Sequence, residues 1–139
     1  MTNWFLGRVS FDEEQGNGSL KKVSEDYLVN AYSFTEAEAK LVEEMGVDGR
    51  FEVQSVKKEK VWELRRNENE NGLFFKSKLA LITLDEKSGK EKMTSVNVYT
   101  QNEKIDDVHK SIDDIMRDSM MDFKVTSITE TKIVGIILA

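Results

Sequence analysis

The sequence contains no cysteine and no proline, and it has a single histidine. Without cysteine the chain forms no disulfide, binds no metal through thiolates and has no cysteine nucleophile. Proline removes a backbone donor from a β-ladder, so its absence is compatible with long strands joined by hairpins. Glycine supplies the turn chemistry instead, in residues 16–19 and 88–90. These absences favour a strand-rich fold without covalent cross-links.

Long apolar runs are also missing. The longest, residues 133–139, is much shorter than the roughly 20 residues that a membrane-spanning helix requires. The chain begins Met-Thr-Asn-Trp, without the basic stretch and apolar segment of a secretory signal. Apolar residues make up 39% and charged residues 33%, which is typical of a globular protein. We therefore expect a soluble protein of the bacterial cytoplasm with no membrane partner.

Catalytic motifs are absent as well. The sequence has no phosphate-binding loop, dinucleotide fingerprint or serine-nucleophile motif. Its paired carboxylates fall in expected turns and on polar helix faces, whereas acid–base catalysis needs carboxylates in partly desolvated settings. His109 lies between Asp106 and Asp113 at helical spacing, but one imidazole without a thiolate binds transition metals poorly. We expect no enzyme activity, no catalytic residue, no cofactor and no metal.

The second half of the chain resembles the first. Three pairs of segments correspond: residues 11–16 with 84–89 (73 positions apart), 34–45 with 105–116 (71 apart), and 51–61 with 123–133 (72 apart). The spacing changes only between elements, where loops absorb insertions at little cost. A half of about 70 residues would bury only a marginal core. The pattern predicts one pseudo-symmetric domain, residues 1–139, in which repeat A (about 3–66) and repeat B (about 74–138) share a core.

Period-two alternation predicts most of the secondary structure as strands. A Ser-x-x-Glu capping box at Ser33 predicts a helix to about Met45, ended by Gly46. A second helix is expected over residues 105–116, capped by Asn102. The expected strands are residues 4–11, 22–32, 51–58, 60–66, 74–84, 93–101, 123–129 and 132–138.

These elements define an α+β fold of order ββα-ββ-ββα-ββ. About eight strands form antiparallel sheets, and two helices pack on one face and leave the opposite face open. Residues 67–72 are a polar break and the expected junction between the repeats. From residue 51 onward, four strands followed by one helix form a unit that the remaining pieces would match across the termini. An open sheet face also invites a homodimer.

Basic residues gather in the middle of the chain. Residues 49–92 carry eleven Lys or Arg and eight Asp or Glu, a net of +3, whereas the whole chain carries −6. Aromatic residues are interleaved with these bases. Cations that follow phosphates and rings that stack on bases are typical of single-stranded nucleic-acid binding. The candidate binding residues are Lys60, Trp62, Arg65, Arg66, Phe74, Lys76 and Lys78.

Other interpretations of the same residues stay open. Lysines on strands also protect sheet edges from aggregation, and Trp62 and Phe75 also fit a hydrophobic core. The first hypothesis is a non-enzymatic protein that binds single-stranded DNA or RNA in phage or mobile-element replication or transcription. The alternative is a phage accessory protein that acts through protein–protein contact, for example on a host enzyme or a host defence.

Two motifs carry a resemblance to a known family. Residues 27–39 (YLVNAYSFTEAEA) and residues 81–92 (LITLDEKSGKEK) resemble an uncharacterised domain family of gut anaerobic bacteria and their phages. This resemblance implies no functional residues, because no activity is established for that family. The expected four-strand-plus-helix unit is similar in topology to the Whirly and Pur-type folds, in which two units associate and a sheet face binds the strand. That topological likeness implies a nucleic-acid-binding sheet, although fold does not fix function.

Overall fold

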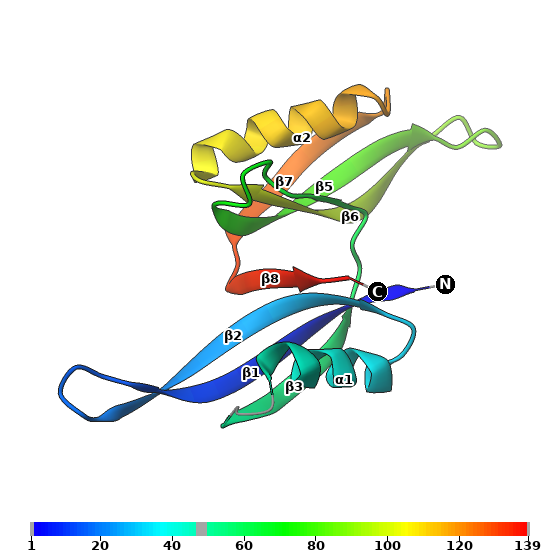
Figure 1. Cartoon of the computed structure of the whole chain (residues 1–139). Coiled ribbons are helices and arrows are strands. Elements are labelled where there is room, and N and C mark those ends of the chain that lie inside the picture. Colours follow the sequence, from blue (N-terminus) through cyan, green and yellow to red (C-terminus); the bar gives the residue numbers. More distant parts are fainter. Residues whose placement is uncertain (1, 47–49, 139) are drawn as a thin grey trace. The chain divides into compact units, whose positions relative to one another are not determined.

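The computed structural model describes residues 2–46 and 50–138 of the chain. It has eight strands in two four-stranded sheets, and a helix packs on each sheet (Figure 1). The fold is therefore α+β, as the sequence predicts. Two compact units divide the chain: unit 1 comprises Met1–Lys60 and Lys132–Ala139, and unit 2 comprises Val61–Thr131. Within the described ranges, no helix has the length and apolar character needed to cross a membrane.

Unit 1 is built around one long hairpin. Strands β1 and β2 pair antiparallel along their whole length, β3 joins β1 antiparallel, and β8 joins β2 in parallel. The sheet order is β3-β1-β2-β8, with α1 across one face (Figure 1). The elements are β1 (Asn3–Glu14), β2 (Leu20–Ala31), α1 (Phe34–Met45), β3 (Phe51–Glu59) and β8 (Ile133–Ile137).

Helix α1 begins at the expected capping box. The Ser33 hydroxyl accepts a hydrogen bond from the Glu36 N–H at 3.1 Å. The Glu36 carboxylate accepts one from the Tyr32 N–H at 3.1 Å, so two backbone donors at the helix start have partners. Gly46 ends the helix with a positive φ of 84°, a conformation that glycine adopts without strain. The predicted bounds of this helix are confirmed.

The core of unit 1 lies between α1 and the sheet. Phe5, Val9 and Val29 project from β1 and β2 toward Ala37 and Leu41 of the helix, and all five side chains are buried. Leu41 lies directly over Gly7, where an added Cβ would collide with the leucine methyl groups. Gly7 therefore lets the helix approach the sheet closely.

Unit 2 repeats this arrangement. A long antiparallel hairpin, β5 and β6, is flanked by β7 antiparallel to β5 and by a short β4 parallel to β6. The sheet order is β4-β6-β5-β7. The elements are β4 (Glu63–Arg65), β5 (Leu73–Leu84), β6 (Glu91–Asn102), a 3₁₀ turn η1 (Ile105–Asp107), α2 (Val108–Arg117) and β7 (Asp122–Glu130). A second cluster of buried residues, including Phe75, Leu79, Val98 and Ile112, lies between α2 and this sheet.

The start of the second helix differs from the prediction. The first turn is 3₁₀, the α-helix begins at Val108, and its N-cap residue Asp107 makes no side-chain cap. Asn102 does not cap the helix, because it is the last residue of β6 and pairs with Leu73. Its side chain reaches Ser111 on the helix instead.

The two sheets correspond residue by residue. In unit 1 the register between β1 and β3 shifts between Arg8 and Val9. In unit 2 the register between β5 and β7 shifts between Lys78 and Leu79. These positions lie 70 apart, as do Glu14 and Leu84 at the strand ends, so the spacing of 73 predicted from residues 11–16 was wrong. The sequence similarity between residues 11–16 and 84–89 matched the end of β1 to the turn after β5. Descent from a duplicated sequence stays a prediction.

The chain exchanges strands between its units. Strand β3 belongs to the sheet of unit 1, but the next strand, β4, belongs to that of unit 2. Likewise β7 lies in unit 2, and β8 lies in unit 1. The predicted grouping of β3, β4, β5 and β6 in one four-stranded unit was therefore wrong, and the topological likeness to the Whirly and Pur-type folds loses that basis. The single pseudo-symmetric domain with a shared core stays a prediction.

Candidate functional site

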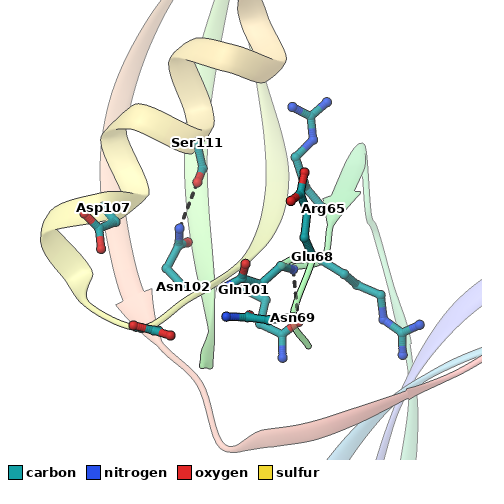
Figure 2. Close-up of a pocket in the computed structure, with 10 residues that line it drawn as sticks. Arg65, Glu68, Asn69, Gln101, Asn102, Asp107 and Ser111 are labelled. Carbon is teal, nitrogen blue, oxygen red and sulfur yellow. Dashed lines mark hydrogen bonds between the residues drawn. The ribbon is translucent and has the colours of Figure 1, made fainter. Parts of the chain in front are cut away.

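A polar pocket of about 380 Å³ lies in unit 2, beyond the ends of two parallel strands (Figure 2). Residues 65–69 line it from the end of β4 and the segment that follows, and residues 101–103 line it from the end of β6. Asp107 and Ser111 complete it from η1 and α2. Its volume falls in the range of small-molecule sites, about 300–1,000 Å³.

The segment between β4 and β5 is held in place by Gln101. The Gln101 side-chain oxygen accepts a hydrogen bond from the Asn67 N–H, and its amide nitrogen donates to the Glu70 carbonyl, both at 3.1 Å. The Asn67 side chain also donates to the Asn71 carbonyl at 3.0 Å. Gly72 ends the segment with a φ of 115°, and a Cβ there would collide with the Asn102 backbone. Side-chain hydrogen bonds and one glycine thus fix this wall of the pocket.

Asn102 is the most deeply buried polar residue of the pocket. It is 7% exposed, and its amide nitrogen donates to the Ser111 hydroxyl at 2.8 Å, as the dashed line in Figure 2 shows. No described residue donates a hydrogen bond to its side-chain oxygen Oδ1. Buried polar atoms are nearly always hydrogen-bonded, so an acceptor without a donor beside a pocket calls for a physical explanation.

The charges around the pocket are mixed. Arg65 and Arg66 line it together with Glu68, Glu103 and Asp107. Within the described part of the chain, neither arginine forms an ion pair with a carboxylate. Both guanidinium groups therefore keep their donors for a ligand, and the acidic residues oppose an anionic one.

Two of the sequence-predicted residues lie at the pocket, and a third lies at the opposite end of β4. Arg65 and Arg66 line the pocket. Trp62 directly precedes β4, its backbone N–H donates to the Asn97 carbonyl at 2.9 Å, and it is 40% exposed. An exposed aromatic ring and two arginines within five sequence positions are compatible with binding of single-stranded nucleic acid.

The other predicted residues lie elsewhere. Lys60 belongs to unit 1. Lys76 and Lys78 alternate along β5 with residues that face α2, so they lie on the opposite sheet face, and the Lys76 ammonium lies 6.0 Å from the centre of the Tyr99 ring. Phe74 is only 4% exposed, which leaves little of its ring accessible, and its stacking on a base stays a prediction.

Sequence reasoning missed Asn102, Gln101 and Ser111 as site residues. Asn102 was interpreted as a helix cap, and nothing in the sequence shows that β6 would run as far as this residue. Ser111 was an ordinary polar position on the expected helix. The paired positions of Asn102 and Leu73 in the ladder place the amide beside the helix.

A metal site is not evident in the described residues. Residues 2–46 and 50–138 contain no group of three or more His, Cys, Asp or Glu placed to hold a metal ion. His109 is exposed on α2. The pocket is a polar site lined by two arginines without ion pairs to described residues and by a hydrogen-bonded amide wall.

Comparison with known proteins gives a family and no function. No curated protein and no solved structure matches this chain. Residues 3–139 match the family described as "Domain of unknown function (DUF4494)". This match covers nearly the whole sequence, as expected from the resemblance to an uncharacterised domain family. The chain belongs to this family of domains of unknown function.

Proposed function

We propose that this protein binds single-stranded nucleic acid without catalysing a reaction, and that the strand lies across the polar pocket of unit 2. The supporting observation is that Arg65 and Arg66, both without ion pairs to described residues, line the same pocket as a set of amide side chains. Guanidinium groups bind phosphate through two parallel hydrogen bonds. Amide side chains hydrogen-bond to base edges.

Trp62, directly before β4, supplies the aromatic ring of the proposed binding surface. It lies three residues before Arg65, a distance of roughly 10 Å along an extended strand. A ring and a guanidinium group at this spacing can contact neighbouring nucleotides of one strand. Stacking on an exposed aromatic ring contributes about 1–3 kcal/mol per base and tolerates any base, since every base has a π-face.

The acidic residues limit the affinity. Three carboxylates line the pocket beside two arginines, and the whole chain carries a net charge of −6. Repulsion between these carboxylates and phosphates weakens binding and is screened as salt is added. We therefore propose modest affinity that is most easily measured at low ionic strength.

Binding of a fluorescent thirty-mer of mixed sequence, followed by anisotropy over a salt series, tests the proposal. Each phosphate contact contributes about 0.7 to the slope of log K against log salt for a single strand. Arg65→Ala with Arg66→Ala should lower the steepness of that slope by about 1.4. The matched control removes two exposed lysines away from the pocket, Lys92→Ala with Lys124→Ala. No binding at low salt, or equal losses in both double variants, contradicts the proposal.

Tryptophan fluorescence tests the role of Trp62. The sequence has two tryptophans, and Trp4 lies in unit 1. In a Trp4→Phe background the remaining emission comes from Trp62, and stacking of a base on its ring should quench it. Replacement by leucine should weaken binding by about 1–3 kcal/mol with little change in the salt slope. Unquenched emission at saturation excludes this ring from the contact.

A protein partner is the second candidate, because Met120 and its surroundings are exposed. Met120 is 93% exposed with a φ of 55°, next to Met121 at 41%. Flexible methionine side chains suit adaptable protein surfaces. An affinity pulldown that returns one stoichiometric protein after nuclease treatment, and loses it in Met120→Ser, supports this candidate. A role of nucleic-acid binding in phage or mobile-element replication or transcription stays a proposal. Formation of a homodimer stays a proposal as well.

A further inference from the structure

We infer that Asn71 is a site of spontaneous deamidation, by which the segment between β4 and β5 gains one negative charge as the protein ages. The modification is independent of the proposed function, and only its effect on strand binding rests on that function. The chain has two Asn-Gly pairs, residues 17–18 in unit 1 and residues 71–72 in unit 2. Asparagine is chemically labile, most of all before glycine, whose missing side chain leaves the backbone nitrogen open to reaction.

The reaction joins the asparagine side chain to the next backbone nitrogen. The Gly72 nitrogen loses its proton to hydroxide and attacks the Asn71 Cγ atom, so that a C–N bond closes a five-membered ring. The bond from Cγ to Nδ2 breaks, and this nitrogen takes a proton from water and leaves as ammonia. Water then opens the ring at either carbonyl, which leaves aspartate or isoaspartate at position 71. Both products carry a carboxylate in place of a neutral amide, and no step needs an oxidant or a cofactor.

Both reacting groups of this pair are free in the described structure. Asn71 and Gly72 are exposed to solvent. The Asn71 backbone donates to Asn69 and accepts from Asn67, but the Asn71 side-chain amide forms no hydrogen bond with a described residue. The Gly72 N–H likewise has no partner among the residues that the structure describes. Neither group has to break a hydrogen bond of its own before the two react.

The other pair is held by hydrogen bonds. The Gly18 N–H donates to the Gln15 carbonyl at 3.0 Å, so it must leave this partner before its nitrogen can attack. The Asn17 Oδ1 atom accepts from the Ser19 N–H at 3.1 Å and from the Ser19 hydroxyl at 2.6 Å, and these bonds hold the amide in the turn. One hydrogen bond contributes about 1 kcal/mol, which corresponds to about fivefold in a rate. We therefore expect position 71 to react at least fivefold faster than position 17.

The change at Asn71 reaches the wall of the pocket. The Asn71 N–H donates to the Oδ1 atom of Asn69 at 3.2 Å, and its carbonyl accepts from the Asn67 side chain at 3.0 Å. Both of these partners line the pocket. In the isoaspartate product that carbonyl becomes the free carboxylate, and the chain continues through Cγ with one more atom. Gly72 already lies tightly against the Asn102 backbone, so the longer link shifts the segment, and the new charge opposes the anionic ligand that we propose for the pocket.

Mass spectrometry of the ageing protein tests the site. The purified chain is kept in mildly alkaline buffer, and the peptides that contain residues 17 and 71 are quantified over time, since the exchange of an amine for a hydroxyl raises the peptide mass. The peptide with residue 71 should convert at least fivefold faster. In urea, which removes the hydrogen bonds of the turn, the two rates should become nearly equal. Equal rates in the folded protein overturn the inference, and a difference that persists in urea overturns its structural basis.

Two variants assign the reaction to one residue. Asn71→Gln should abolish the fast conversion and the appearance of isoaspartate, because a glutamine would have to close a six-membered ring, which forms much more slowly. The matched change in unit 1, Asn17→Gln, should leave the fast conversion as it is in the wild type. Fast release of ammonia that survives in Asn71→Gln places the reaction at another residue and overturns the assignment.

Binding of the fluorescent thirty-mer measures the effect on the pocket. Asn71→Asp carries the charge of the aged protein without the altered linkage, and it should weaken binding by about 1.4- to 5-fold, as expected for one exposed charge, and by less at high salt. The control Asn17→Asp adds the same charge to unit 1 and should bind like the wild type. Unchanged binding by both Asn71→Asp and the aged wild type overturns the effect on the pocket. Failure of fresh wild-type protein to bind at low salt removes the proposed function, whereas the conversion of Asn71 is judged by mass alone.

Discussion

Units 1 and 2 share a strand order but differ in what lies beneath their helices. Three matched positions, 70 or 71 apart, are small or apolar in unit 1 and polar in unit 2. They are Gly7 and Ser77, Val29 and Thr100, and Ala31 and Asn102. All three polar residues of unit 2 have a buried side-chain oxygen without a partner in the described structure. The difference teaches that unit 1 is packed with small or apolar residues at these positions, whereas unit 2 buries polar ones, of which Asn102 lines the pocket.

The helices differ at a matched position as well. Lys40 on α1 corresponds to Ser111 on α2, and its ammonium donates to the carbonyls of Asn30 at 2.9 Å and Leu138 at 3.4 Å. A salt bridge of 3.3 Å to Glu36 also holds it. This lysine thus fastens α1 to the ends of β2 and β8, where unit 2 has the pocket. The long side chain of Lys40 thus occupies the position in unit 1 where the short side chain of Ser111 leaves room for the pocket in unit 2.

The largest expected effect comes from removal of residues 132–139. The variant lacks β8, so the β2 edge loses its partner and the buried Ile133 is gone from the core. Loss of such a side chain alone costs about 2–5 kcal/mol. Urea unfolding followed by Trp4 fluorescence in a Trp62→Phe background measures the effect on unit 1. Ile133→Ala should reproduce part of it, whereas Val134→Ala, at an exposed position, should not. An unchanged midpoint after the deletion contradicts the role of β8.

The second prediction compares alanine at two matched strand positions. Gly7→Ala should destabilise by about 1–3 kcal/mol, because the new methyl group pushes Leu41 away from the sheet. Ser77→Ala should be neutral or stabilise by about 1 kcal/mol, because it removes a buried hydroxyl that has no partner. Thermal and urea unfolding of both variants provide the comparison. Equal effects of the same sign would show that the two helices approach their sheets alike.

The third prediction concerns the helix starts. Ser33→Ala removes the side-chain cap of α1 and should cost about 0.5–2 kcal/mol. Lys104, the matched position before η1, makes no cap, so Lys104→Ala should change stability very little. Urea unfolding measures both. A loss in Lys104→Ala as large as that in Ser33→Ala would remove this difference between the units.

The smallest effect concerns pH. Burial, together with Glu25, raises the pKa of the Tyr27 hydroxyl to about 12. The folded state thus holds this proton more firmly than the unfolded chain, whose tyrosine pKa is about 10. The resulting stability is present below pH 10 and is lost as the pH rises toward 12. Tyrosinate absorbance should show a late component that Tyr27→Phe removes. Val98 occupies the matched position in unit 2, and a late component that survives the substitution belongs to another tyrosine.

Local patterns in the sequence were sufficient for most elements. Period-two alternation located the long hairpins, and the Ser33 and Glu36 side chains made the first helix recognisable from the sequence alone. These features depend on neighbours a few residues apart. The pairing partner of a short strand does not depend on such neighbours, and the three residues of β4 are too few to indicate which sheet the strand joins. Sequence reasoning therefore could not assign β4 to the sheet of unit 2 or β8 to that of unit 1. The pocket depends on the first of these pairings, because it lies beyond the end of β4.

The second property that the sequence predicted poorly was the burial of individual side chains. Phe74 and Phe75 are consecutive, so they point to opposite sheet faces, and alternation alone makes one of them exposed. Both are buried, at 4% and 2% exposure. Little of the Phe74 ring is thus accessible for stacking, whereas Trp62, Arg65 and Arg66 are exposed.

The path of the chain decides how the protein can be divided for experiments. The stretch from Val61 to Thr131 is uninterrupted, so a single gene fragment encodes the pocket with all the strands of its sheet. A fragment begun at residue 74, where the second repeat of the sequence starts, would discard Arg65 and Arg66. The other unit consists of two separate segments of the chain, so a gene for it alone must join residues 1–60 and 132–139 through a new connection.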